Sequence, residues 1–311
     1  MSGDAVTVVK ARSRLAKLVR ADGVIEAYDH VKTVDLVEVP IIGLDDLERL
    51  LRLLAQRPDY CVVRGAIAHA ERTKGVRRLL HPDPDTGDAA TLREWPRRWV
   101  ALDFDRLQRP EWIEPVDLVG CAAVAIETLP DEFQGACFVV QATASQGIKP
   151  GIRIRLWAWL SRPASGGELK WWLRTAPVDQ SAFSAVQLIY TASPLFSPGA
   201  KDPIPQRLEV VPGESVVVMP PSGVLKPPRW GRQSHRSSAG TATGLIRVVV
   251  QAEAGNRNRA LYWASRRMAE KIARGEMTSA QAMGLLEGAA RQIGLPMREA
   301  AATIASGLKH G

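Results

Sequence analysis

The segment RRWVALDFD, residues 97–105, decides both the predicted fold and the predicted chemistry. Its apolar part, Trp99 to Leu102, is typical of a buried strand, and it runs directly into Asp103 and Asp105. Because side chains two residues apart on a strand point to the same face, the two carboxylates converge. Their charges repel each other unless a cation lies between them, and such oxygen ligands favour Mg²⁺ or Mn²⁺. The segment predicts a metal site; the alternative is a strand end that releases two acids into solvent.

The elements around this segment are predicted in the order β-α-β-β-α-β. We expect a strand over 99–104, a helix over 116–129, strands over 136–142 and 152–160, a helix over 167–176 and a strand over 185–191. This is the ferredoxin-like succession, so the predicted fold class is α+β. The flanking elements are predicted as a helix over 47–56, a strand over 60–64, a loop over 72–91 and short strands over 206–211 and 215–219.

Asp179, which lies just before the last predicted strand, is the candidate third acid. In the usual ferredoxin-like sheet the first strand lies between the third and the fourth and runs antiparallel to the fourth. The end of the first strand then meets the start of the fourth, which brings Asp179 towards Asp103 and Asp105. Three carboxylates would provide for the two metals of an in-line phosphoryl displacement. Alternatively, Asp179 is an ordinary polar residue between a helix and a strand.

The segment SQGIKPGIRIRLWAWL, residues 145–160, adds positive charge beside these acids. Three cations, Lys149, Arg153 and Arg155, follow a turn-rich entry and suit a triphosphate. By alternation, the two arginines share one face of the strand with Trp157 and Trp159. That face either covers the sheet with long side chains or stacks unpaired bases of a single strand.

The 311-residue chain carries a net charge of +8, which favours a polyanionic partner such as nucleic acid. Candidate DNA contacts outside the acid segment are the basic residues Arg64, Arg72, Lys74, Arg77, Arg78, Arg229, Arg232 and Arg236. Alternatively, the basic residues in 72–78 belong to a loop that is only solvated. Arg229, Arg232 and Arg236 would alternatively belong to a plain tether without DNA contacts. The chain contains no GxxxxGK[ST] motif for ATP-driven unwinding.

Three domains are predicted: a catalytic domain over 1–225, a basic linker over 226–244 and a helical domain over 245–311. The linker is rich in Pro, Gly, Ser and Thr and contains no acid. Three helices are expected after it, with Thr278 and Gln281 at the spacing of a capping box and Pro296 opening the last helix. The cysteines are far apart, and neither a signal peptide nor a membrane span is predicted, so we expect a cytoplasmic protein.

Taken together, these segments resemble the archaeo-eukaryotic-type primase superfamily, in its plasmid and phage primase-polymerase branch. WVALDFD resembles the first motif of that superfamily, SQGIKPGIRIRLW stands in the place of its second motif, and VDQSAFSAVQLIYTASPLF resembles its third. The C-terminal stretches GNRNRALYWASRRMAEKI and AAATIASGL are similar to the helical domain that such primases often carry.

The resemblance implies a nucleotidyltransferase that makes short primers from NTPs or dNTPs on single-stranded DNA, beside a separate replicative helicase or initiator. It assigns Asp103, Asp105 and Asp179 to two Mg²⁺ or Mn²⁺ ions, and places Ser145, Lys149, Arg153 and Arg155 near the incoming nucleotide. The second motif of the superfamily usually ends in a histidine, yet this chain has none between His81 and His235. Two alternatives remain: a non-catalytic initiator or single-strand-binding protein of the same fold, and a metal-dependent nuclease.

Overall fold

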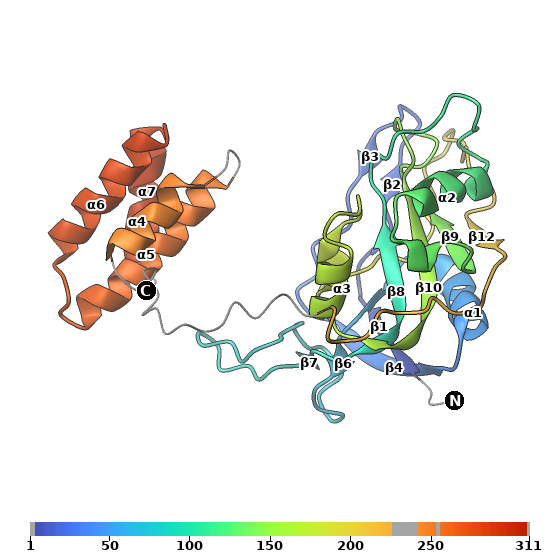
Figure 1. Cartoon of the computed structure of the whole chain (residues 1–311), viewed down its shortest axis with the longest axis horizontal. Coiled ribbons are helices and arrows are strands. Elements are labelled where there is room, and N and C mark those ends of the chain that lie inside the picture. The colour runs from blue at the N-terminus through green and yellow to red at the C-terminus, as the bar shows by residue number, and fades with distance from the viewer. Residues whose placement is uncertain (1–3, 226–241, 253–255, 310–311) are drawn as a thin grey trace. The chain divides into compact units, whose positions relative to one another are not determined.

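The computed structural model describes residues 4–225, 242–252 and 256–309, and its contacts divide the chain into two units, Met1–Pro227 and Pro228–Gly311. The elements of the first unit are β1 (Asp4–Lys10), β2 (Leu18–Val19), β3 (Ile25–Glu26), β4 (Asp35–Ile41), α1 (Leu44–Ala55), β5 (Tyr60–Val63), β6 (Ala66–Ile67), β7 (Leu92–Arg93), β8 (Arg97–Asp103), α2 (Leu118–Glu127), η1 (Asp131–Phe133), β9 (Phe138–Ala142), β10 (Ile154–Ala164), α3 (Gly166–Trp172), η2 (Gln180–Phe183), β11 (Leu195–Phe196) and β12 (Leu208–Val211). The described elements of the second unit are α4 (Ala242–Val250), α5 (Arg257–Ala273), α6 (Ser279–Gln292) and α7 (Met297–Lys309). Small, mainly antiparallel sheets combined with helices confirm the predicted α+β class (Figure 1).

An antiparallel sheet with the strand order β12-β9-β10-β8 forms the centre of the first unit. Its last three strands have the relative order expected for a ferredoxin-like sheet, but the predicted fourth strand over 185–191 is wrong. The backbone of Ile189 exchanges hydrogen bonds of 2.8 and 3.0 Å with Val62 of β5 instead. Gly65 likewise donates to the carbonyl of Ala185 at 3.0 Å. The backbone of 185–191, which was expected to pair with β8, therefore pairs with β5 and with the residue two positions after it.

A second sheet, in the order β4-β1-β5, packs against one face of the central sheet. Val6 and Val8 of β1 contribute to the shared core, which also contains Trp99, Trp157 and Trp159 with exposures of 0, 0 and 5%. The hypothesis that Trp157 and Trp159 stack single-stranded bases is therefore wrong. These rings are buried because a sheet that the sequence did not predict covers their face.

Helices cover the opposite face of the central sheet. Val100 and Leu156 point into a core with Leu118 of α2 and Leu169 of α3. Figure 1 shows α2 and α3 on the near side of the sheet, and they bury the apolar alternation of β8, β9 and β10. With both faces covered, the remaining accessible parts of the central sheet are its edges and strand ends. The first acid of the predicted site lies at such an end.

Arg64 lies inside the first unit with 2% of its surface exposed, so its predicted role as a DNA contact is wrong. Its guanidinium donates to the backbone carbonyls of Trp99, of Arg97 at 3.2 Å and of Ala164 at 2.7 Å. Burial lowers the pKa of Arg64 to about 9, which leaves it protonated at neutral pH. The side chain connects the segment after β5 to both β8 and β10.

The other predicted elements of the first unit are confirmed in most cases. The helix over 47–56 is α1 and the strand over 60–64 is β5, while the segment 72–91 has no helix or strand among its residues. The strand over 206–211 is β12. A strand over 215–219 is wrong, because only Val217 forms an isolated bridge, with Leu160. In the described residues no helix has the length and apolar character needed to cross a bilayer.

In its described residues, the second unit is a bundle with one more helix than predicted. The capping box of Thr278 and Gln281 forms at the start of α6, and Gly275 and Gly294 take the positive φ values expected after α5 and α6. The additional helix, α4, begins at Ala242 and therefore includes the last residues assigned to the linker. Arg229, Arg232 and Arg236, the proposed DNA contacts of that linker, lie outside the described residues.

We expect Arg64→Leu to lower the free energy of unfolding by about 3 kcal/mol, because it leaves three buried carbonyls without their donor. Denaturation by urea, followed by tryptophan fluorescence, measures the change. Arg72→Leu, at an exposed position, is the matched control and should alter stability by less than about 0.5 kcal/mol. Equal effects of the two substitutions would contradict a structural role for Arg64.

Candidate active site

A pocket of about 240 Å³ lies where β8 ends beside β10. It contains every residue predicted to bind a metal or a nucleotide: Asp103, Asp105, Ser145, Lys149, Arg153, Arg155 and Asp179. Its remaining lining residues are Lys17, Tyr28, Phe104, Arg106 and Thr143. Segments that are far apart in the sequence thus come together at one end of the central sheet, which makes this pocket the candidate active site.

Strand pairing places the two acids of the first motif against two arginines. Arg155 lies directly across from Asp103 in the register of β10 with β8, and its Nη2 donates to Asp103 Oδ2 at 2.6 Å. Arg153 forms an ion pair with Oδ1 of Asp105. Both arginine side chains are 8% exposed, whereas Asp105 is 63% exposed. Charge-assisted hydrogen bonds to buried guanidinium groups therefore hold both carboxylates at the pocket.

Asp179 reaches the end of β8 without the strand that was expected to carry it there. Its amide donates to the carbonyl of Asp103 at 2.9 Å. Its carboxylate caps η2 by accepting from the Ser181 amide at 2.9 Å and from the Ser181 hydroxyl at 2.8 Å. Among residues 4–225, 242–252 and 256–309, no group of three or more His, Cys, Asp or Glu could hold a metal ion as arranged. Metal binding by the three acids stays a prediction.

The loop between β9 and β10 is held in place by Gln146, whose side chain is fully buried. Its Nε2 donates to the carbonyl of Pro115 at 2.7 Å, and its Oε1 accepts from the amide of Arg153 at 2.8 Å. Gly151 has φ +82°, and a Cβ there would lie 2.7 Å from the carbonyl oxygen of Leu107. These contacts tie the loop that carries Lys149 to the segment that follows β8.

The N-terminal segment completes the pocket with Lys17 and Tyr28, which sequence reasoning missed. Tyr28 stacks on Tyr190, with ring centroids 3.4 Å apart and an interplanar angle of 4°. The ammonium group of Lys17 lies 5.3 Å from the centroid of the Tyr28 ring. The only feature of the sequence that pointed to Lys17 was its place in a basic stretch. Its position at the pocket depends on the pairing of β2 with β11, which lies about 180 residues later in the chain.

Burial and neighbouring charge perturb both of these residues. The pKa of Lys17 is lowered, first by burial and next by the nearby Lys149, while Asp105 and Asp103 act in the opposite direction. Burial also raises the pKa of the Tyr28 hydroxyl well above its usual range. Perturbed groups around a polar pocket are typical of functional sites.

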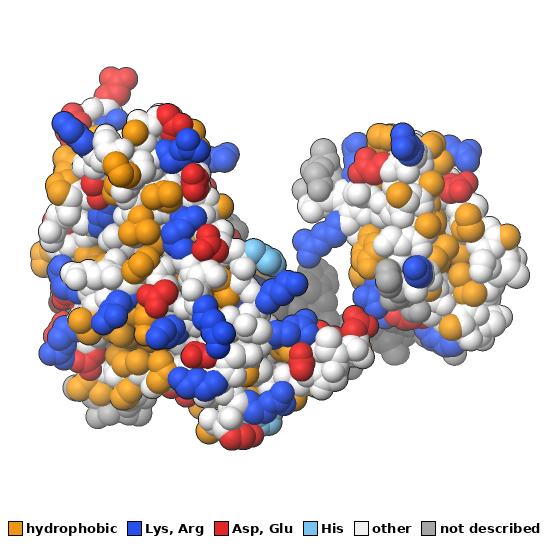
Figure 2. Space-filling model, turned by 180° about the vertical axis from the view of Figure 1, so that it is seen from behind, with side chains coloured by type: hydrophobic (Ala, Val, Ile, Leu, Met, Phe, Trp, Pro, Cys, Tyr) orange, Lys and Arg blue, Asp and Glu red, His pale blue; other side chains and the backbone are white. Residues whose placement is uncertain are grey.

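The other candidate DNA contacts differ in their availability. Lys74 is 82% exposed and lies 3.8 Å from Asp35. Arg77 is bound by Asp83 and Asp88, and Arg78 donates to the carbonyl of Val186. On the face of the first unit seen in Figure 2, Lys and Arg side chains are interspersed with acidic and hydrophobic ones. Lys74 is thus better placed than Arg77 or Arg78 for a phosphate contact.

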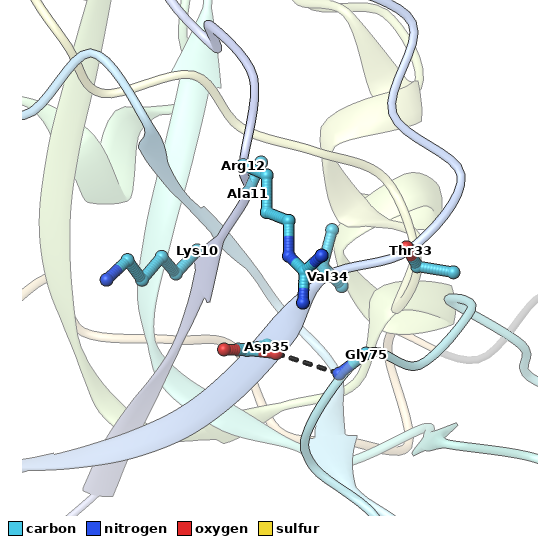
Figure 3. Close-up of a pocket in the computed structure, with 7 residues that line it drawn as sticks. All are labelled: Lys10, Ala11, Arg12, Thr33, Val34, Asp35 and Gly75. Carbon is cyan, nitrogen blue, oxygen red and sulfur yellow. Dashed lines mark hydrogen bonds between the residues drawn. The ribbon is translucent and has the colours of Figure 1, made fainter.

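A second hollow, of about 390 Å³, is lined by Lys10, Ala11, Arg12, Thr33, Val34, Asp35 and Gly75. The Asp35 carboxylate accepts a 2.8 Å hydrogen bond from the Gly75 amide, and Figure 3 shows the Lys10 side chain extending away from the Arg12 guanidinium. This hollow is larger than the acid-lined pocket, but it contains none of the predicted metal or nucleotide residues and a single acid. Its chemistry does not match the motifs.

The fold and the pocket define an α+β protein with a small pocket that is lined by both acids and cations. Part of the chain is similar to a protein of Escherichia phage T5 named "Putative replication origin binding protein", with 32% identity over 182 residues. The similarity covers 52% of this chain and 18% of the phage protein, so the chain spans a small part of that relative. No family model matches the chain, and no solved structure matches it.

We expect Gln146→Met to lower the free energy of unfolding by about 2–3 kcal/mol, because the Pro115 carbonyl and the Arg153 amide lose their partner in a buried place. Thermal denaturation monitored by circular dichroism measures the loss. Gln187→Met, at an exposed position, should have little effect. If Gln146→Met were as stable as the parent chain, the loop would not depend on this side chain.

Proposed function

We propose that this chain acts in phage or plasmid DNA replication as a primase-polymerase, joining nucleotides on a single-stranded template with Mg²⁺ or Mn²⁺. One observation carries the proposal: Asp103 and Asp105, at the end of β8, share a single small pocket with Lys17, Lys149, Arg153 and Arg155. Acids that hold a divalent ion beside cations that bind phosphates are the requirements of nucleotidyl transfer. The name of the phage T5 relative supports a role in replication.

The donor set of the pocket suits a hard divalent cation. Asp103 uses Oδ2 and Asp105 uses Oδ1 in their ion pairs, so each contact with an arginine occupies one oxygen of a carboxylate. Asp179, whose amide is bonded to the Asp103 backbone, is the nearby third carboxylate. Such ions, when bound, activate the primer 3′-hydroxyl and stabilise the leaving pyrophosphate. Asp103, Asp105 and Asp179 would hold them.

The protein's own cations would orient the triphosphate of the incoming nucleotide. Arg155 is fixed by Asp103 and by the carbonyl of Tyr190, which accepts from its Nη1 at 2.6 Å. Arg153 is fixed by Asp105 and by the carbonyl of Pro150 at 3.1 Å. Guanidinium groups that are already ordered lose little conformational entropy when a phosphate binds. A separate helicase or initiator would supply the single-stranded template.

A second candidate function is DNA binding at an origin without chemistry. Two observations favour it: the name of the phage T5 protein, and the ion pairs that give Asp103 and Asp105 protein partners in this structure. In that case Arg153 and Arg155 would be structural partners of the acids. Removal of the acids would then leave DNA binding unchanged. No strand-extension product would be lost, because the parent chain would make none.

We expect the double variant Asp103→Asn, Asp105→Asn to lose nucleotide incorporation by about 1,000-fold, because amides bind divalent ions much more weakly than carboxylates. The measurement uses single-stranded DNA, with and without an annealed primer, and labelled NTPs or dNTPs with Mg²⁺ or Mn²⁺. Asp131→Asn, an exposed acid away from the pocket, is the control and should retain full activity. Both variants should bind single-stranded DNA as the parent chain does.

The products distinguish the three functions. Longer strands that depend on the two acids support the polymerase, and shortened template strands that depend on them support a nuclease. Binding without any acid-dependent product would sink the polymerase proposal and favour the initiator.

Binding to single-stranded DNA should weaken steeply as salt rises, because cations that contact phosphates displace counterions. We expect Lys74→Ala to reduce the slope of log affinity against log salt by about 1, as for the loss of a single phosphate contact. Lys170→Ala, an exposed lysine of α3, is the matched control. Fluorescence anisotropy with a labelled oligonucleotide at several salt concentrations gives both slopes; identical slopes for the two variants would exclude Lys74 from the interface.

A further inference from the structure

The cations of the pocket fall into two groups according to their partners. Arg153 and Arg155 are ion-paired with Asp105 and Asp103. Lys17 and Lys149 also line the pocket, but neither forms an ion pair within the described part of the chain, and the same holds for the exposed Arg106. The two lysines therefore have no carboxylate within ion-pair distance among the described residues, although Asp105 and Asp103 lie near enough to raise the pKa of Lys17.

Lys17 is held at the pocket by the strand pairing on either side of it. Its carbonyl accepts from the amide of Leu195 at 2.8 Å, and the next two residues form β2, which pairs with both β11 and β3. Its ammonium group lies over the Tyr28 ring, which is itself stacked on Tyr190. A lysine with a fixed backbone and an aromatic neighbour loses less conformational freedom on binding an anion than a fully solvated lysine.

Burial and neighbouring cations disfavour the charge of Lys17, and Asp105 and Asp103 offset this only in part, because the net effect is a lowered pKa. Lys17 is half-buried, and burial together with the neighbouring Lys149 lowers its pKa. Two cations that share a small pocket repel each other, and partial desolvation strengthens that repulsion. A polyanion between them would relieve that repulsion. Converging lysines favour an anion between them, as converging acids favour a cation.

We propose that Lys17, together with Lys149, binds the phosphate groups of the incoming nucleoside triphosphate. The proposal rests on the proposed nucleotidyl transfer and adds a residue from outside the three motifs. Lys17 thereby supplies a positive donor from the N-terminal segment at a site whose second motif lacks a histidine. The pocket of about 240 Å³ is small and its lysine half-buried, which suits a discrete triphosphate better than a continuous strand that needs an open groove.

The test measures binding of dATP and of ATP to the full chain with Mg²⁺ by isothermal titration calorimetry. Lys17→Met keeps the aliphatic stem and removes the charge, and we expect it to weaken triphosphate binding at least about tenfold. Lys17→Arg keeps the charge and should stay within about threefold of the parent chain. Lys10→Met is the matched control, because Lys10 also lies over a tyrosine ring, 5.6 Å from that of Tyr60, but outside the pocket. Circular dichroism checks that each variant is folded.

The pH dependence separates direct phosphate contact from mere packing. Burial, Lys149 and Arg153 lower the pKa of Lys17, whereas Asp105 and Asp103 raise it, and the net shift is downwards. Deprotonation removes the charge of Lys17, so triphosphate affinity should fall at high pH. Lys17→Arg should keep its affinity to higher pH, because a guanidinium remains protonated there. A purely structural role for Lys17 predicts the same pH profile for both chains.

The outcomes distinguish this inference from the proposed function. Unchanged triphosphate binding by Lys17→Met, or none by the parent chain, overturns the inference, and primer extension by the parent chain would still support the polymerase. Loss of single-stranded DNA binding in place of triphosphate binding also overturns it, in favour of a template contact. Triphosphate binding that depends on Lys17, without any strand extension, supports the inference and excludes the proposed polymerase function.

Discussion

The antiparallel pairing of β8 with β10 is the constraint on which the site depends. Its register sets Arg155 across from Asp103, and cross-strand neighbours at this separation bring opposite charges into contact. A shift of β10 by one residue would turn Arg155 towards the opposite face and carry the tryptophans of β10 out of their core. The packing of Trp99 and Trp157 between two sheets therefore fixes the same register that aligns the charges.

Local patterns in the sequence predicted the central part of this arrangement. The apolar run before Asp103 and the alternation in β10 are periodic signals, and they fix strand type and side-chain direction without long-range information. Gathering of the predicted acids and cations in one pocket follows from those directions and from the expected strand order. Asp179 meets the end of β8 although the strand expected to bring it there is absent, because a backbone hydrogen bond to Asp103 does so.

What the sequence did not predict depends on contacts between distant segments. β1 has four consecutive buried residues and the burial of β4 does not alternate, and nothing in their local sequence says that they cover the tryptophan face of the central sheet. Arg64 resembles any surface arginine until its three carbonyl acceptors are known. The sequence also gives no local sign of the role of Lys17, because the pairing of β2 with β11 brings this residue to the pocket.

The pairing of β2 with β11 also affects how the protein folds during its synthesis on the ribosome. The parallel contact between β2 and β11 joins parts of the chain that are about 180 residues apart, so the pocket closes only after β11 has been made. Domains form as units during synthesis, and contacts of such long sequence separation arise late. Until β11 has been made, the segment between the first strand and Tyr28 lacks the strand that holds Lys17 at the pocket, so a nascent chain exposes this basic segment without its partner.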